Sequence, residues 1–147
     1  MKPFERIMLP TDFSLGADGA AEVAAELARS MKASVDVISV VDTRTFDTIY
    51  GDEAYRKQRI DDIHGQARSD MQQFVDLHFK GVPGVKIHVR DGDTFLEILQ
   101  AAKDLGSDMI VMGTHGRTGL AHVLIGSVTE KVVRKSSIPV VTVRGQA

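Results

Sequence analysis

The chain contains no cysteine. Disulfide bonds, thiolate catalysis and cysteine-based metal sites are therefore excluded. Long apolar runs are also missing, because no segment approaches the roughly 18 apolar residues of a membrane span. The opening residues, MKPFERIMLP, lack the apolar stretch of a secretory signal. We therefore expect a cytoplasmic protein with no membrane partner.

Neither sign of charge dominates. Eighteen Lys and Arg face twenty Asp and Glu, for a formal net charge of −2. This balance gives no global basic field, so we expect no nucleic-acid partner. The 147 residues, 43% of them hydrophobic, are typical of one globular domain. No internal repeat or linker divides the chain, which predicts a single domain over residues 1–147.

Short apolar runs alternate with helical patterns along the chain. The predicted strands cover Ile7–Pro10, Val35–Val41, Val85–Val89, Met109–Met112 and Val140–Val143. The predicted helices cover Ala17–Lys32, Ala54–Lys80, Phe95–Leu105 and Val128–Lys135. The connections are long enough for crossovers. This order predicts an α/β fold, a doubly wound five-stranded parallel sheet with helices on both faces.

Two of the predicted helices begin with a capping-box pattern. Thr94 is followed by Glu97, and Ser127 is followed by Glu130. We expect Thr94 and Ser127 to cap these helices through their hydroxyl groups.

The stretch GTHGRTGLAHVLIGS, Gly113–Ser127, places four glycines directly after the predicted strand MIVM. Its last residues lie at a predicted helix N-terminus, where free N–H groups and the helix dipole favour an anion. In the alternative interpretation, Gly113 only closes a strand and Ser127 only caps a helix. Both interpretations are compatible with the spacing alone.

Two familiar phosphate motifs are absent. The chain has no G-x-x-x-x-G-K-[ST], and its first strand is followed by PTDFSLG rather than G-x-G-x-x-G. The spacing present is G-x2-G-x9-G-[ST], over Gly113, Gly116 and Gly126-Ser127. Together with PTDFS at positions 10–14, it resembles the ATP-binding branch of the universal stress protein family, from about Ile7 to Val143. The resemblance implies a Rossmann-like fold of the adenine nucleotide alpha hydrolase-like type.

The resemblance also implies roles for individual residues. Asp12, in the Pro10-Thr11-Asp12 motif, would contact the ribose, and the backbone of Val40 would pair with the adenine edge. Met112 and Gly113 would line the ribose and base. The phosphates would be held, partly by main-chain N–H groups, by Gly116, Gly126, Ser127, Val128 and Thr129. Arg117 either reaches a phosphate or is an exposed loop arginine.

These observations favour an ATP-binding or adenine-nucleotide-binding stress-response and regulatory protein. The alternative is an enzyme that hydrolyses ATP slowly or uses the nucleotide at the same site. We assign no catalytic residue and no dedicated metal site, although Mg²⁺ carried in with the phosphates is plausible. His115 and His122 lack the partners that general-base catalysis or metal binding would need.

The fifth strand, in IPVVTV, is expected to lie at a sheet edge because Pro139 at its start lacks an N–H. Its apolar residues Val140, Val141 and Val143 leave that edge ready to pair. A homodimer through this strand is the simplest closed arrangement, and the family resemblance implies the same. In the alternative, Arg144–Ala147 cover the edge of a monomer.

Overall fold

A computed structural model describes residues 3–12, 15–44, 51–114 and 125–144. Strands and helices alternate along the chain, as the sequence predicts. The strands are β1 (Arg6–Pro10), β2 (Ser34–Val41), β3 (Val85–Asp91), β4 (Met109–Gly113) and β5 (Val140–Val143). The helices are α1 (Leu15–Met31), α3 (Glu53–His78), α4 (Thr94–Asp104) and α5 (Ser127–Lys135).

The five strands form one parallel sheet in the order β3-β2-β1-β4-β5. This arrangement confirms the predicted fold class. It also confirms the predicted edge position of β5, and β3 lies at the other edge. The chain winds outward from β1 in one direction to β3 and then restarts at β4 on the other side of β1. Strand order therefore switches between β1 and β4, which is where open α/β sheets bind ligands.

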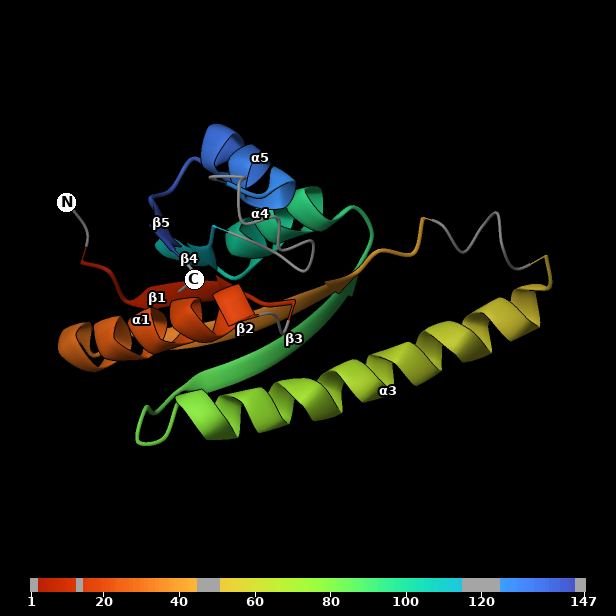
Figure 1. Ribbon diagram of the computed structural model, residues 1–147, viewed down its shortest axis with the longest axis horizontal. Coiled ribbons are helices and arrows are strands. Elements are labelled where there is room, and N and C mark those ends of the chain that lie inside the picture. Colours follow the sequence, from red (N-terminus) through yellow and green to blue (C-terminus); the bar gives the residue numbers. More distant parts are fainter. Residues whose placement is uncertain (1–2, 13–14, 45–50, 115–124, 145–147) are drawn as a thin grey trace.

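Helices cover both faces of the sheet (Figure 1). On one face α1 and α3 pack against alternate strand residues, among them Ile7, Val35 and Val37. On the other face α4 and α5 pack against the intervening residues, including Met8 and Ile38. Two apolar cores therefore flank the sheet, and the near-continuous apolar runs of the central strands follow from burial on both sides.

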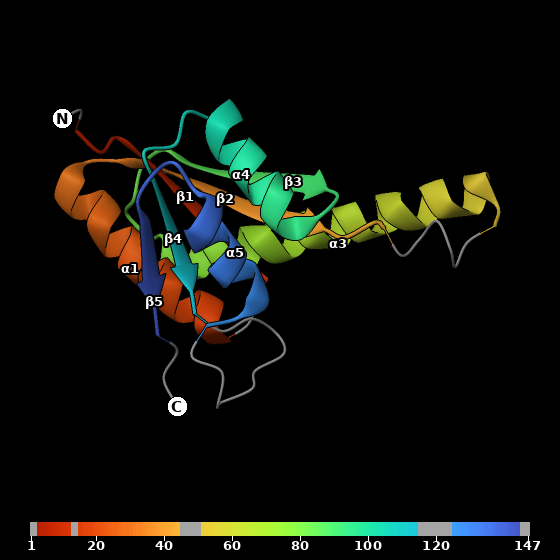
Figure 2. The same ribbon diagram turned by 90° about the horizontal axis from the view of Figure 1, so that it is seen from above.

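Helix α3 is longer than the sheet that it covers. Its N-terminal turns extend past the carboxyl ends of the strands in both views (Figures 1 and 2). The buried residues of α3 are Ala67, Met71 and Phe74, and all three lie in the second half of the helix. Of the helices in these described ranges, none is both long enough and apolar enough to cross a bilayer.

The predicted capping boxes are wrong. Helix α4 begins one residue earlier than expected, with Asp93 as its N-cap and Thr94 as its first helical residue. The Glu97 side chain lies back over Gly92, but its carboxylate accepts a hydrogen bond from Arg90 Nε at 3.2 Å rather than from the N–H of the cap residue. Asp93 itself makes no side-chain capping bond. A nearby arginine competes with the local capping geometry at this site.

Helix α5 departs from its predicted capping box in the same way. Its N-cap is Gly126, so Ser127 becomes the first helical residue. The carboxylate of Glu130 pairs instead with Arg134, one turn along the helix. The first turn of α5 therefore has no capping side chain from its own N-cap residue, and its backbone N–H groups remain for other partners.

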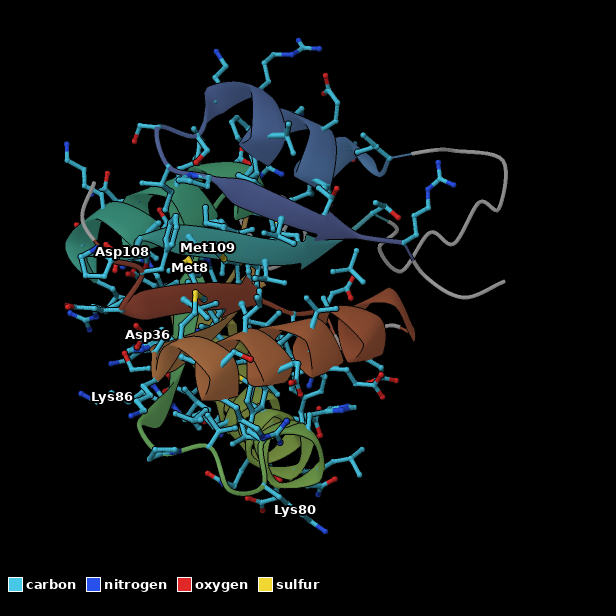
Figure 3. All side chains as sticks on the ribbon, turned by 90° about the vertical axis from the view of Figure 1, so that its left-hand side faces the viewer. Met8, Asp36, Lys80, Lys86, Asp108 and Met109 are labelled. Carbon is cyan, nitrogen blue, oxygen red and sulfur yellow. The ribbon has the colours of Figure 1, made fainter. Side chains whose placement is uncertain are left out.

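Charged groups gather at the amino-terminal ends of the strands (Figure 3). Asp36 of β2 is 2% exposed, and its Oδ1 accepts a hydrogen bond from His88 Nε2 at 2.8 Å. Its Oδ2 lies 3.7 Å from Arg6 Nη2 of β1. Asp108, just before β4, accepts hydrogen bonds from the backbone N–H groups of Glu5 and Arg6 at 2.9 and 3.0 Å. These contacts join four strands at this end.

Candidate nucleotide-binding cleft

A cleft of about 580 Å³ opens at the other end of the sheet. It lies where β1, β2 and β4 finish and α5 begins, and α3 and α4 contribute residues to its walls. The carboxyl ends of β1 and β4 flank the point where strand order switches. Because the crossovers leave these two strands toward opposite faces, their loops diverge and leave a crevice between them.

Ten of the twelve predicted site residues line this one cleft, although they come from four separate parts of the chain. They are Pro10, Thr11, Asp12, Val40, Met112, Gly113, Gly126, Ser127, Val128 and Thr129. The other two, Gly116 and Arg117, lie outside the described residues, as do His115 and His122. The structure brings the ten residues together, and their individual roles in binding stay predictions.

The β1 side of the cleft is fixed by the backbone. The N–H of Thr11 donates to the carbonyl oxygen of Ile38 at 2.9 Å, which extends the β1–β2 pairing one residue beyond Pro10. Thr11 is 8% exposed, whereas Asp12 is half-buried at the edge of the cleft. The end of β1 is therefore held against β2, and Asp12 directly follows this bonded residue.

The α5 side is fixed by a side chain. The hydroxyl of Thr129 donates to the carbonyl oxygen of Gly113 at 2.9 Å, so the first turn of α5 is held against the end of β4. This hydroxyl hydrogen is therefore already used within the protein. The backbone N–H groups at the start of α5 have no intrahelical acceptor and point along the helix axis. They, with the helix dipole, make this end of the cleft suited to an anion.

Gly126 does not need to be glycine for conformational reasons. Its φ of −67° and ψ of 159° belong to the extended region, which any residue adopts. A side chain at this position would stand beside the start of α5. The backbone geometry therefore permits a substitution here that tests the space in the cleft rather than the fold.

The opposite part of the cleft is acidic. Asp12, Asp42 and Asp70 contribute to its walls, and none of the described lining residues is Lys, Arg or His. Arg44 lies at 2.6 Å from Asp42 and also contacts Asp93 at 2.9 Å. The hydrogen bond from Arg44 lowers the pKa of Asp42, so this carboxylate is ionised at neutral pH. This side of the cleft suits hydrogen-bond donors on a ligand rather than phosphates.

Sequence reasoning missed the wall that α3 contributes. Ile63, Gln66, Ala67 and Asp70 reach the cleft from this helix, and Ser39 lines it from β2. Ile63 and Ala67 are apolar residues four apart in the predicted helix Ala54–Lys80, and they are half-buried and buried, as this spacing would suggest. The polar residues Gln66 and Asp70 are four apart, but Gln72 and Asp76 have the same spacing and do not line the cleft, so the spacing gave no signal for the site.

Other sequence features have structural explanations. Gly92 and Asp93 connect β3, which ends at Asp91, to α4, and Gly92 takes a φ of 132° that favours glycine. Asp52 is the exposed N-cap of α3 and accepts a hydrogen bond from the Ala54 N–H at 3.0 Å. Across the described ranges, His, Asp and Glu side chains do not gather in any group of three that could hold a metal ion.

Known proteins resemble this chain in sequence and in structure. The universal stress protein family matches residues 3–144. Universal stress protein MJ0577 of Methanocaldococcus jannaschii is 31% identical over 96% of this chain and 95% of its own. The MJ0577 structure superposes with a TM-score of 0.88 at 30% identity, covering 99% of both chains. UspA from Lactobacillus plantarum gives 0.81 at 26% identity, over 98% of this chain and 100% of its own.

One further solved relative contains a nucleotide. The universal stress protein from Archaeoglobus fulgidus in complex with dAMP superposes with a TM-score of 0.68 at 20% identity, over 96% of this chain and 98% of its own. At that identity the likeness concerns the fold. The family match over residues 3–144 and the MJ0577 relationship are the decisive findings. The chain belongs to the universal stress protein family.

Proposed function

We propose that the protein binds an adenine nucleotide, ATP in the first instance, in the cleft at the carboxyl end of its sheet. The proposal rests on one observation, that residues from four separate segments line this one cleft. These segments are Pro10–Asp12, Val40, Met112–Gly113 and Gly126–Thr129. The dAMP complex of a family member supports the choice of an adenine nucleotide. Occupancy of the site would then regulate a stress response.

The two ends of the cleft suit the two ends of such a ligand. Phosphates fit the start of α5, where backbone N–H groups and the dipole favour negative charge. Asp12 would offer an acceptor for ribose hydroxyls, and the backbone at Val40 would meet the base. The described cleft residues include no cationic side chain to balance the phosphate charge, and the described residues form no metal-binding group. We therefore propose that Mg²⁺ enters bound to the phosphates rather than at a site of its own.

Gly126→Val tests the phosphate end directly. The extended backbone at Gly126 accepts valine, so the variant should fold, while the branched side chain crowds the start of α5. Isothermal titration should show strongly weakened ATP binding, and wild-type affinity should fall in the order ATP, ADP, AMP. Gly65→Val is the matched control, since a Cβ at Gly65 meets nothing within 4 Å and the residue lies on α3 outside the cleft lining.

The outcome separates the two functional classes. Unchanged ATP affinity in Gly126→Val would contradict the assignment of the cleft. Stoichiometric binding of unaltered ATP supports a regulatory binding protein. Steady release of phosphate at saturating ATP and Mg²⁺ would instead support slow hydrolysis at the same site.

We also propose that the protein forms a homodimer through β5. The strand lies at the sheet edge, and Val140, Val141 and Val143 are only half-buried. The carbonyls of Pro139 and Val143 accept hydrogen bonds from Ile110 and Thr114, so by alternation Val140 and Thr142 direct their backbone groups to the free edge. A second copy of the same strand, related by a two-fold axis, would satisfy these groups.

Thr142→Pro removes one outward N–H without touching the β4 side of the strand. We expect it to shift the protein from dimer to monomer in sedimentation velocity, whereas Thr142→Val, which keeps the N–H, should leave a dimer. A wild-type protein that sediments as a monomer at micromolar concentration would contradict the proposal.

A further inference from the structure

The cleft has a wall on the α3 side of the sheet to which the proposed phosphate and ribose contacts assign no role. Along β2, Val35 and Val37 pack with the α1 and α3 core, whereas Ile38 packs with the α4 and α5 core. Ser39 shares the orientation of Val35 and Val37, because side chains alternate along a strand. It therefore lies on the same side as Gln66 and Asp70, and all three line the cleft.

Ser39 is the first indication that this wall meets a ligand. The residue is 8% exposed, and no hydrogen bond to its hydroxyl is found within the described part of the chain. Buried hydroxyl groups nearly always have a hydrogen-bond partner. The Ser39 oxygen is not among the unpaired polar atoms that are fully enclosed in the described part of the protein, so it is open to the cleft and can bond with what the cleft holds.

Gln66 and Asp70 give this wall its chemical character. Gln66 Nε2 donates to Asp70 Oδ1 at 2.9 Å, which couples the two side chains across one helical turn. The amide uses a donor in this contact, whereas its own carbonyl oxygen and the second oxygen of Asp70 are acceptors. The wall therefore offers mainly acceptors and calls for N–H donors on the ligand.

We propose that Ser39, Gln66 and Asp70 recognise the exocyclic amino group of the base and make the site selective for adenine over hypoxanthine nucleotides. This inference rests on the proposed function. The adenine amine has two N–H donors, so one can meet the backbone at the end of β2 while the other faces the α3 wall. Hypoxanthine carries a carbonyl oxygen at the same position and would place an acceptor against acceptors. Sites that are built to hydrogen-bond a group discriminate against analogues that lack it.

The test compares ATP and ITP on the full-length protein by isothermal titration. Wild type should bind ATP about 10–100-fold more tightly than ITP, the range for one hydrogen bond to a charged group. Asp70→Asn replaces an acceptor with an amide that can donate. It should weaken ATP, strengthen or maintain ITP, and bring the ratio of the two affinities close to one.

Asp76→Asn is a matched control on the same helix. Gln72 Nε2 donates to Asp76 Oδ1 at 2.9 Å, the same i, i+4 pair as Gln66 and Asp70, but neither residue lines the cleft. This variant should keep the wild-type ratio.

Ser39→Ala provides a second, independent variant. It should lower the ATP to ITP ratio while its melting temperature stays at or above that of wild type, since the hydroxyl makes no bond within the described protein.

The outcomes distinguish this inference from the proposed function. A wild type that binds ATP and ITP equally, or an Asp70→Asn variant with an unchanged ratio, overturns the inference while nucleotide binding stands. Equal weakening of both nucleotides by Asp70→Asn also overturns it, because that result indicates a structural role. A wild type that binds neither nucleotide overturns both.

Discussion

Acidic groups lie at both ends of the sheet, but their surroundings differ. At the amino-terminal end, Asp36 and Asp108 are engaged by His88, by Arg6 and by backbone N–H groups of the β1 strand. At the carboxyl end, Asp12, Asp42 and Asp70 stand around an open cleft whose described walls contain no cationic side chain. Acidic groups at the first end hold strands together, whereas Asp12 and Asp70 at the second end line a cleft that a ligand can enter, beside an Asp42 that is paired with Arg44.

The difference follows from how a parallel sheet is wound. All strands enter at one end and leave at the other, so the loops that diverge at the switch between β1 and β4 open only the carboxyl end. The amino-terminal end has no such divergence, and neighbouring strands can lock their first residues together. Substitutions should therefore separate stability from binding according to the end at which they are made.

The largest effect is expected on stability, at the amino-terminal end of the sheet. Asp36→Ala leaves Arg6 and His88 without their shared carboxylate, and we expect a loss of about 3 kcal/mol in the free energy of unfolding. That figure is the low end for breaking a buried pair, because the side chains of Arg6 and His88 are 43% and 27% exposed and keep contact with water. Chemical denaturation provides the measurement.

Binding should be unaffected by the same change. ATP affinity of Asp36→Ala, measured below its unfolding transition, should match wild type because Asp36 does not line the cleft. Asp36→Asn, which keeps the shape and an acceptor, should lose less stability than the alanine variant. A loss under about 1 kcal/mol in Asp36→Ala would show that the pair contributes no more than an exposed salt bridge.

The second largest effect is expected at the carboxyl end of the sheet, where a substitution should weaken binding more than stability. Asp12→Ala should weaken nucleotide binding by roughly 1.5–3 kcal/mol, as expected for hydrogen bonds to a charged group. Any change in its free energy of unfolding should be smaller than this loss. Adenosine and ATP should lose equally in titration calorimetry, since both carry the ribose. If ATP alone weakened, Asp12 would act through a phosphate-bound metal rather than through the ribose.

The fold was predictable from the sequence because its signals are local. The β-branched run of β2 and the apolar stripe of α3 each mark one element, and alternation of the two kinds implies the parallel sheet. The predicted and observed bounds of β5, Val140–Val143, are identical. The capping boxes failed because Glu97 and Glu130 have arginine partners, and a pattern of four residues does not include such competitors.

The site was predictable only in part, for a related reason. The family resemblance supplied Asp12, Val40 and Gly126, and the order of the strands explains why these residues meet at the carboxyl edge. The contribution of α3 depends on the angle at which a long helix crosses the sheet. That angle results from packing around Met71 and Phe74, so nothing in the local sequence of Gln66 or Asp70 indicates which strand end they approach.

The smallest effect concerns the acidic rim of the cleft. Arg44 lowers the pKa of Asp42 below its ordinary value of 3.8, and a lowered pKa means that folding favours the ionised carboxylate. The stabilising contribution is therefore fully present above the unfolded pKa and is lost as the pH falls through the lower folded value.

Arg44→Gln should raise the pKa of Asp42 in a carboxyl-resolved NMR titration. Because Arg44 is exposed, the variant should melt close to wild type at pH 7, and the small difference should disappear in acid. An unchanged Asp42 pKa in Arg44→Gln would mean that this contact at the open end is not formed in solution.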